Sequence, residues 1–335
     1  MYEDFFGFRE RPFDLTPNPR LLVLVEAHRE ALSNLKYAIA TRKGLALLLG
    51  EAGAGKTTVI RAAVEAQGST VHCVHIHNPA LTRGEFVEML AHKFNLSAEA
   101  RTSKARLLLE IEAMLRTRNA AGETTVLIVD EAQSLPIELL EEIRLLANIE
   151  TDERKLLTVI IAGQPELGER LNDPQLRQFK QRIALRCELR PLTLSETGGY
   201  LAGRIHAVGG IGRQVFTREA VMMIHERSGG IPRIINVLAD NALLSGFATG
   251  TRPVSTQILL EVCKDFDLSA PESLEQPPAA VPPETQKDGR LLLMSPRESA
   301  SQPREADKPA PAEEVGEATG SLGVGRRFLD FLGSR

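Results

Sequence analysis

A glycine-rich octapeptide at residues 50–57, Gly-Glu-Ala-Gly-Ala-Gly-Lys-Thr, combines residue types and spacing that suggest phosphate chemistry. Its pattern, G-x-x-x-x-G-K-[ST], is typical of loops that bind the phosphates of a nucleotide. The glycines let backbone N–H groups face one anion, and the helix expected from Thr57 onward adds a partial positive charge. We therefore expect Lys56 to contact the β- and γ-phosphates and the Thr57 hydroxyl to bind Mg²⁺.

Two adjacent carboxylates, Asp130 and Glu131, follow an apolar run at residues 126–129, about seventy residues after the loop. A buried parallel strand delivers such a pair to the carboxyl edge of a sheet, where ligands of open α/β sheets bind. Asp130 is predicted to hold Mg²⁺ together with Thr57, through a water, and Glu131 to polarise an attacking water. The pair favours hydrolysis over simple binding. The predicted nucleotide-binding residues are Gly50, Glu51, Ala52, Gly53, Ala54, Gly55, Lys56, Thr57, Thr58 and Asp130.

Gln164 lies at the tip of another apolar run, residues 156–162. A polar side chain there can sit between the two carboxylates and the γ-phosphate, so Gln164 is a candidate sensor of the nucleotide. The alternative is that Gln164 only caps a turn before Pro165. The sequence leaves both interpretations open.

Five basic residues fall within fourteen positions at the end of the expected α/β domain: Arg177, Lys180, Arg182, Arg186 and Arg190. Most such runs are solvated faces. In oligomeric ATPases an arginine from this region completes the site of a neighbouring subunit, which makes Arg182 and Arg177 candidate arginine fingers. The same residues could instead contact DNA phosphates.

Arg233 follows the sequence Gly-Gly-Ile-Pro at residues 229–232. Proline suits the first turn of a helix, and the preceding glycines allow a close approach of the backbone. This places Arg233 at a helix start, from which it could reach the nucleotide and couple binding to domain closure. A solvated surface arginine is the alternative.

Cys73, His75 and His77 alternate within the apolar segment at residues 71–77. Three alternate residues of a strand span about 13 Å, which is too far to share one metal ion. We therefore do not expect a metal site from these residues.

Short apolar runs alternate with helical stretches up to about residue 191, which indicates parallel βαβ units and a doubly wound α/β sheet in three layers. Strands are expected at 45–49, 71–76, 126–129 and 156–162, and a capping box, Thr82 with Glu85, is expected to start one helix. Beyond residue 192 only helices are expected, at 195–207, 217–228 and 232–245. The predicted organisation is an α/β domain at 1–191 and a small helical lid domain at 192–267.

The composition changes near Asp267. Residues 268–325 hold nine of the 19 prolines, no aromatic residue, ten acids and five bases. Such a segment cannot bury enough apolar surface to offset its chain entropy, so we predict a disordered linker. The last ten residues, 326–335, place Phe328, Phe331 and Leu332 on one face of a possible helix, and we expect a short docking peptide or a frayed end.

The overall composition limits the class of protein. Of the 335 residues 43% are hydrophobic and 25% charged, with a net charge of −4, so a protein that mainly coats nucleic acid is not favoured. The apolar runs are too short to span a bilayer, and the N-terminus does not resemble a secretory signal. We therefore expect a cytoplasmic protein, held at a membrane only by a partner. The three cysteines are too dispersed for a disulfide framework.

Taken together, these motifs resemble the general secretion pathway protein A (ExeA-type) AAA+ ATPases over residues 1 to about 265. The matching segments are Phe-Gly-Phe at 6–8, Pro-Phe at 12–13, Pro-Asn-Pro at 17–19, His-Arg-Glu-Ala-Leu at 28–32, Asp-Glu-Ala-Gln at 130–133, Arg-Leu-Leu-Ala-Asn at 144–148, Gly-Gln-Pro-Glu-Leu at 163–167, Gln-Arg-Ile at 181–183 and Gly-Ile-Pro-Arg-Ile-Ile-Asn at 230–236. The resemblance implies an AAA+ fold, ATP hydrolysis, and assembly into rings or filaments. It also implies that residues 12–19 flank the adenine and that Arg233 is the sensor-2 arginine.

Secretion members of this family often carry a transmembrane helix and a peptidoglycan-binding domain, and neither is recognisable in this sequence. The resemblance then implies an assembly or regulatory ATPase for an export, secretion or pilus system, with the tail expected to dock on an inner-membrane partner. Related ATPases of the family select targets in transposition, so an ATP-dependent DNA-binding switch is the alternative. A third hypothesis is a nucleotide-gated scaffold with little turnover.

Overall fold

The computed structural model describes residues 1–14, 23–77 and 81–268, all within one compact unit, Met1–Pro271. The predicted C-terminal peptide, all of the predicted linker except Leu268, and most of the segment expected beside the adenine lie outside the described residues. In the described part, no helix combines the length and the apolarity that crossing a membrane requires.

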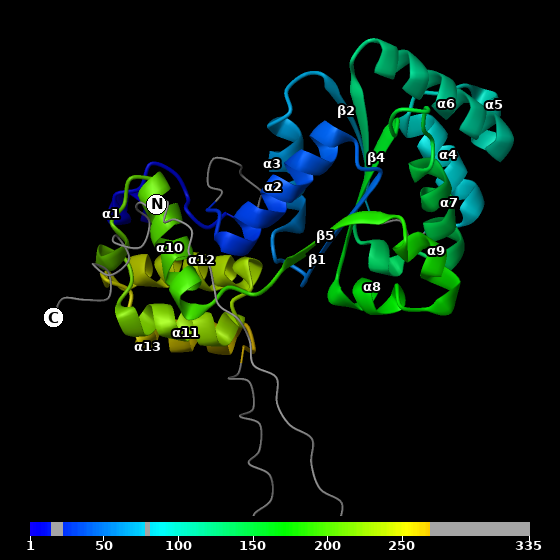
Figure 1. Cartoon of the computed structure of the whole chain (residues 1–335). Coiled ribbons are helices and arrows are strands. Elements are labelled where there is room, and N and C mark those ends of the chain that lie inside the picture. The colour runs from blue at the N-terminus through cyan, green and yellow to red at the C-terminus, as the bar shows by residue number, and fades with distance from the viewer. Residues whose placement is uncertain (15–22, 78–80, 269–335) are drawn as a thin grey trace, which may run out of the picture. The chain divides into compact units, whose positions relative to one another are not determined.

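A parallel sheet of five strands forms the centre of the fold (Figure 1). The strands are β1 (Leu45–Gly50), β2 (Val71–Ile76), β3 (Thr124–Val129), β4 (Leu157–Gly163) and β5 (Ile183–Leu189), in the order β2-β3-β4-β1-β5. All neighbours are parallel, so every strand ends at the same edge of the sheet. The predicted α/β class is therefore confirmed, and the carboxyl ends of β1, β3 and β4 meet at one edge.

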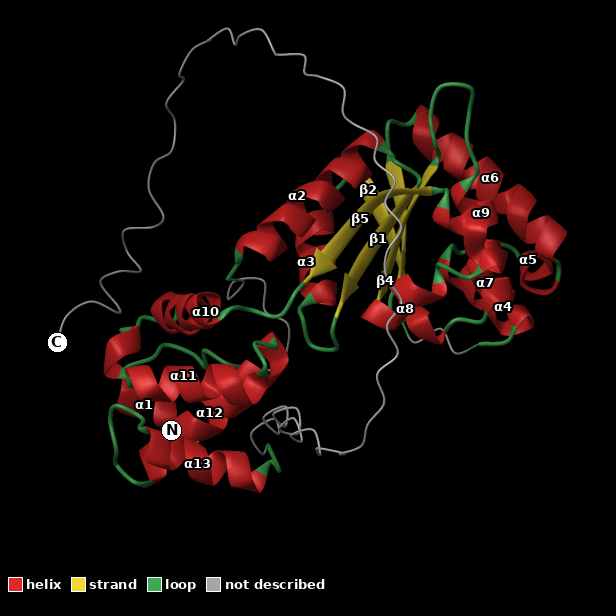
Figure 2. Ribbon diagram, turned by 60° about the horizontal axis from the view of Figure 1, so that its bottom comes forward, coloured by secondary structure: helices red, strands yellow, loops and turns green. Residues whose placement is uncertain are grey.

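Helices cover both faces of this sheet, which gives the predicted three layers (Figure 2). The helices α2 (Glu26–Thr41) and α3 (Lys56–Glu65) pack on one face. The opposite face is covered by α4 (Arg83–Lys93), α5 (Ala98–Thr102), α6 (Lys104–Ala120), α7 (Ile137–Ala147), α8 (Pro165–Arg170) and α9 (Arg177–Lys180). Because side chains alternate along a strand, Ala46 and Leu48 face the first pair of helices, while Leu45 and Leu47 face the second group.

The predicted start of α4 is confirmed in atomic detail. The Thr82 hydroxyl accepts the backbone N–H of Glu85, and the Glu85 carboxylate accepts the backbone N–H of Thr82 at 2.8 Å. This reciprocal pairing satisfies two N–H groups that the first turn of a helix would otherwise leave without partners.

After β5 the described chain is helical. The elements are α10 (Leu194–Ala207), α11 (Arg218–Ser228), α12 (Pro232–Ala248) and α13 (Thr256–Asp265). The first three match the predicted helices, whereas α13 was not predicted. It buries Ile258, Leu259 and Val262 and contacts α11 and α12.

The N-terminal residues differ from the prediction, which assigned them to the α/β domain. The helix α1 (Tyr2–Phe6) contacts α12, and the Tyr2 hydroxyl donates to the Asp240 carboxylate. Further along, the Arg9 guanidinium donates to the carbonyl of Ala207 at 3.0 Å, and the rings of Phe13 and Phe216 lie 6.2 Å apart. Residues 1–13 therefore complete the core of the helical part, because Tyr2, Phe6, Phe8 and Phe13 are buried there.

Candidate functional site

The glycine-rich loop joins β1 to α3 at the carboxyl edge of the sheet. Gly53 and Gly55 adopt left-handed backbone conformations, with φ of 83° and 98°, which side chains other than glycine rarely adopt. A Cβ atom on Gly50 would lie 3.0 Å from the Leu189 carbonyl oxygen at the end of β5. The loop therefore depends on glycine for its conformation and for its packing.

Lys56 is the first residue of α3, and its side chain is buried within the loop. The Nζ atom donates to the carbonyls of Gly50 at 2.8 Å and Glu51 at 3.1 Å. Burial lowers the pKa of the ammonium, while the carboxylates of Glu131 and Asp130 oppose this effect. The side chain lies where its charge can exchange carbonyl partners for phosphate oxygens.

Thr57 and Asp130 meet across the gap between α3 and the end of β3. The Thr57 hydroxyl donates to Oδ2 of Asp130 at 2.7 Å, and the buried carboxylate also accepts the backbone N–H of Glu131 on Oδ1 at 3.0 Å. Hydroxyl and carboxylate oxygens are the ligands that Mg²⁺ prefers, and their adjacency beside the phosphate loop fits a magnesium site. The fold thus brings together the two residues predicted to hold the metal.

Glu131 adopts a left-handed conformation, with φ of 55°, immediately after β3. Its carboxylate accepts a hydrogen bond of 2.7 Å from the side-chain amide of Gln133. The side-chain oxygen of Gln133 accepts the backbone N–H of Gln164 at 3.1 Å. Gln133 therefore links the predicted catalytic carboxylate to the end of β4.

Gln164 is the N-cap residue of α8, but its side chain makes no capping hydrogen bond there. Gln164 therefore occupies the N-cap position, but its side-chain amide does not stabilise the start of the helix. Gln164 lies between β4 and α8, next to the end of β3 that carries Asp130 and Glu131. Its role as a sensor of the nucleotide stays a prediction.

Two residues of the site were given no role by the sequence analysis. His28, on α2, is buried, and its Nε2 donates to the carbonyl of Ala54 in the loop at 2.9 Å. Burial lowers the pKa of this imidazole. Gln133 is the second residue, and its place at the end of the family-matching segment Asp-Glu-Ala-Gln at 130–133 was the signal for it in the sequence.

Arg233 is the second residue of α12 and lies directly against the phosphate loop. Its backbone N–H donates to the carbonyl of Gly53 at 3.2 Å. A Cβ atom on Gly53 would lie only 2.5 Å from the Cβ of Arg233. The guanidinium side chain is exposed, so it is free to turn toward a bound nucleotide.

Arg177 and Arg182 lie far from the loop of their own chain. Arg182 immediately precedes β5, whose first residue pairs with Leu45 at the start of β1, whereas the loop follows the end of β1. The length of the strands, about 20 Å, therefore separates Arg182 from the phosphate loop. Both arginines are exposed, and in the described part of the chain neither guanidinium makes a hydrogen bond or ion pair.

The other three bases of this run have different surroundings. The Nζ atom of Lys180 donates to the side-chain oxygen of Asn172 at 2.7 Å, and Arg190 forms an ion pair of 2.8 Å with Glu196. Arg186 lies 3.8 Å from Glu188. Because Arg182 and Arg190 flank opposite ends of β5, the run does not form one continuous basic patch.

His75 and His77 come together in the structure, although the set of Cys73, His75 and His77 that the sequence analysis considered does not. Their ring centroids are 3.6 Å apart, and a ligand atom from each lies within 4.8 Å of the others in a group with Asp130. The reason is that β2 ends at Ile76, so the strand spacing no longer applies to His77. Cys73 is not part of this group, as the sequence had indicated.

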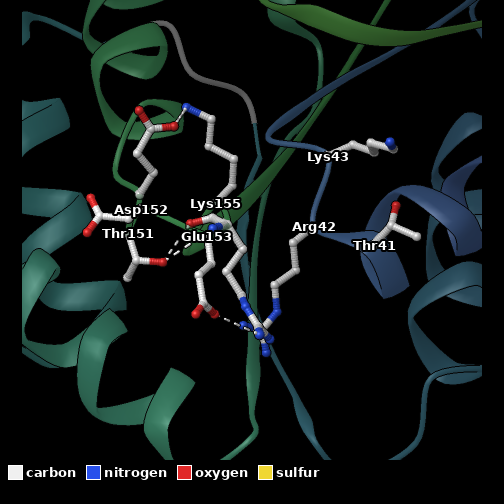
Figure 3. Close-up of a pocket in the computed structure, with 9 residues that line it drawn as sticks. Thr41, Arg42, Lys43, Thr151, Asp152, Glu153 and Lys155 are labelled. Atoms are coloured by element: carbon white, nitrogen blue, oxygen red, sulfur yellow. Dashed lines mark hydrogen bonds and ion pairs between the residues drawn. The ribbon is translucent and has the colours of Figure 1, made fainter.

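A separate pocket of about 580 Å³ opens at the opposite edge of the sheet (Figure 3). It is lined by Thr41, Arg42, Lys43, Glu150, Thr151, Asp152, Glu153, Arg154 and Lys155. Its charges are largely matched internally, because Lys155 pairs with Glu150 and Arg154 with Glu153. The Arg42 guanidinium is also held, by the backbone carbonyl of Glu123 at 2.9 Å.

Comparison with known proteins agrees with this architecture. Residues 39–171 match the model of a family described as an AAA domain. The chain is 41% identical over 254 residues to General secretion pathway protein A of Aeromonas hydrophila. The match covers 76% of this chain and 46% of that protein, so the chain spans about half the length of its curated relative.

Solved structures share the fold at low sequence identity. The ORC2 protein of Aeropyrum pernix superposes with a TM-score of 0.59 at 16% identity, over 77% of this chain and 72% of that chain. Cdc6p of Pyrobaculum aerophilum gives 0.59 at 18% identity, over 78% and 70%. A Walker-type ATPase of Pyrococcus abyssi gives 0.53 at 20% identity, over 77% of both chains. These similarities show the fold alone.

Proposed function

This chain belongs to the AAA ATPase family of General secretion pathway protein A, and from this we propose that it is a magnesium-dependent ATPase. It hydrolyses ATP to ADP and phosphate as an oligomer, and it drives or regulates the assembly of a cell-envelope export, secretion or pilus system. The observation that carries the ATPase proposal is the 2.7 Å contact of Thr57 with Asp130 directly beside Lys56 and the glycine loop.

Each residue of the loop has a distinct role in this proposal. The N–H groups of residues 50–58 surround the phosphates, and Lys56 binds the β- and γ-phosphate oxygens. Thr57, and Asp130 through a water, would hold Mg²⁺, which would neutralise charge on these phosphates. Glu131 accepts a proton from the attacking water. Gln164 and Arg233 sense the γ-phosphate from β4 and from the helical part respectively.

The position of the candidate finger residues supports the proposed oligomer. Because the length of β5 separates Arg182 from its own loop, this arginine can complete a nucleotide site only on a neighbouring subunit. Among the described residues its exposed guanidinium has no hydrogen-bond or ion-pair partner, and neither has that of Arg177, which suits such a role. We therefore propose that Arg182 or Arg177 acts in trans and that hydrolysis requires assembly.

The envelope role rests on the named relative, General secretion pathway protein A. We propose that the protein works in the cytoplasm, at or near the inner membrane, and that residues 268–335 bind an envelope-assembly partner. The DNA-binding switch is less well supported, because the bases from Arg177 to Arg190 flank opposite ends of one strand.

The deciding experiment measures steady-state ATP hydrolysis of the full chain and of Glu131→Gln over a range of protein concentrations, with and without duplex DNA. We expect wild-type turnover per subunit to rise with concentration and to ignore DNA. We expect Glu131→Gln to retain ATP binding and to lose at least about 100-fold in turnover.

Two outcomes would contradict this proposal. Turnover by the wild type no faster than that of Glu131→Gln would indicate a nucleotide-gated scaffold rather than an ATPase. Strong stimulation by DNA that disappears when Arg177, Arg182 and Arg190 are replaced would support the DNA switch instead.

A further inference from the structure

Two histidines and an aspartate converge at the end of β2, beside the candidate nucleotide site. The parallel register pairs Ile76 with Val129, so the next residues along the two strands, His77 and Asp130, are level with each other. His75 approaches the same carboxylate, with Nε2 lying 3.9 Å from Oδ2 of Asp130. One ligand atom from each of the three residues lies within 4.8 Å of the others.

One buried nitrogen of this group lacks a hydrogen-bond partner among the described residues. The Nε2 atom of His75 is buried and has no hydrogen-bond partner in the described structure. An orphaned ring nitrogen in this position is costly unless something else binds it. The neighbouring imidazole of His77, whose ring lies 3.6 Å away, is exposed and therefore able to rotate.

The donor set distinguishes this group from the magnesium site. Imidazole nitrogens suit Zn²⁺ and its neighbours in the first transition row, whereas Mg²⁺ takes oxygen ligands. Four ligands around Zn²⁺ at about 2.1 Å lie about 3.4 Å from one another, so the group must contract by about 1.5 Å. Rotation of the exposed His77 side chain supplies this movement, and the fourth position is left for water or a phosphate oxygen.

We propose that His75, His77 and Asp130 form a binding site for a borderline transition-metal cation, of which Zn²⁺ is the representative. This site is distinct from the one that holds the nucleotide's Mg²⁺, although both use Asp130. It does not depend on the proposed ATPase function, because the three ligands need no nucleotide to converge.

Because both metal sites use the carboxylate of Asp130, zinc binding should affect the magnesium site. Oδ2 of Asp130 is the atom that accepts the Thr57 hydroxyl and also the atom that faces His75. A zinc ion held by the histidines would draw this oxygen away from Thr57. Bound zinc therefore opposes the arrangement that the magnesium site requires, and it acts as an inhibitor of hydrolysis.

The binding test uses the full, tag-free chain without nucleotide. Zn²⁺ affinity is measured by competition with a chromophoric chelator, and Co²⁺ is added as a spectroscopic probe. We expect one ion per chain and visible absorption bands of a low-symmetry Co²⁺ site. We expect His75→Gln and His77→Gln each to weaken Zn²⁺ binding at least about tenfold and to abolish the Co²⁺ bands.

Two variants on the same strand are the matched controls. His72 pairs with Glu123 at 2.7 Å, outside the group, and Cys73 carries an exposed thiol. His72→Gln and Cys73→Ser should bind Zn²⁺ as the wild type does. Because His77 is exposed, His77→Gln should fold normally, which circular dichroism checks independently of any metal.

Hydrolysis supplies a second readout when millimolar Mg²⁺ is present. Zinc at a concentration near its dissociation constant should inhibit ATP hydrolysis by the wild type, and a zinc-selective chelator should restore the rate of hydrolysis. His77→Gln, compared with its own zinc-free rate, should show a zinc sensitivity at least about tenfold lower. The proposal is overturned if nucleotide-free protein binds no zinc, or if binding is unchanged in both histidine variants or is lost in Cys73→Ser.

Discussion

The side-chain amide of Gln133 donates a hydrogen bond of 2.7 Å to the carboxylate of Glu131. The same side chain accepts the backbone N–H of Gln164, so the predicted catalytic base is tied to the tip of the neighbouring strand. A carboxylate that activates water must be held in a fixed orientation, because a small displacement costs much of the rate. We therefore propose that Gln133 positions Glu131.

Removing this link should slow hydrolysis. We expect Gln133→Ala to lower kcat about tenfold with little change in KM, because the carboxylate loses its orientation and the nucleotide contacts do not change. Steady-state kinetics at saturating ATP measures the effect. Gln133→Glu, which cannot donate the amide hydrogen bond, should behave like the alanine variant. A kcat that rises in Gln133→Ala would mean that the bond holds Glu131 in an idle position.

The contact between Gly53 and Arg233 predicts a difference between two glycine substitutions. Gly53→Ala places a methyl group 2.5 Å from the Cβ of Arg233, whereas Gly68 has a similar φ of 79° and open space around it. Both variants should lose about 1 kcal/mol through the left-handed backbone. Gly53→Ala should lose a further 1–3 kcal/mol, approximately, from the overlap, and its ATP affinity should fall.

Denaturant unfolding and nucleotide titration measure these two effects. Equal stability of the two variants, with unchanged ATP binding by Gly53→Ala, would show that α12 does not lie against the loop in solution.

The candidate finger residues predict complementation between inactive subunits. Arg182→Ala should lose at least about tenfold in turnover and retain ATP binding, since its own loop is intact. Mixing it with Glu131→Gln subunits, which carry Arg182, should restore part of the activity. Lys180→Ala is the matched control, because Lys180 is already bonded to Asn172. A mixture no more active than its components would exclude Arg182 from this role, and Arg177→Ala would then be tested in the same way.

The buried histidine beneath the loop predicts a pH dependence of stability. Burial lowers the pKa of His28 in the folded state, with Arg190 lowering it further and Glu196 raising it. The unfolded chain therefore takes up the proton first, and stability should decrease as the pH falls below about 6.5, the pKa of free histidine. His75, whose pKa burial and the charge of His77 lower to about 4, acts in the same direction.

Replacing His28 should reduce this slope. We expect His28→Gln to keep a donor for the Ala54 carbonyl and to show a smaller loss of unfolding free energy between pH 6.5 and pH 5. Urea unfolding across this range measures the change. His92→Gln is the control, since His92 is exposed at the end of α4. A slope unaltered by His28→Gln would show that His28 titrates as in the unfolded chain.

The sequence by itself determined four of the five strands, several helices, and the residues at the ends of these elements. Apolar runs of strand length predicted β1 to β4, and the parallel arrangement of βαβ units predicts that their carboxyl ends meet. This is sufficient to place Lys56, Thr57, Asp130 and Glu131 at one edge, because the two carboxylates follow β3 directly and the other two residues follow β1 after the short glycine loop. Local patterns also predicted the capping box at Thr82 and the helix start before Arg233.

The tertiary structure alone decided which residues from different elements touch. His28 reaches the loop because α2 packs against α3, and His77 reaches Asp130 because of the register between β2 and β3. The aromatic residues of the N-terminus pack into the helical part rather than beside the sheet. Such contacts depend on the relative positions of elements distant in the chain. A periodic pattern records only which face of an element is apolar, and it carries no information about the partner that covers that face.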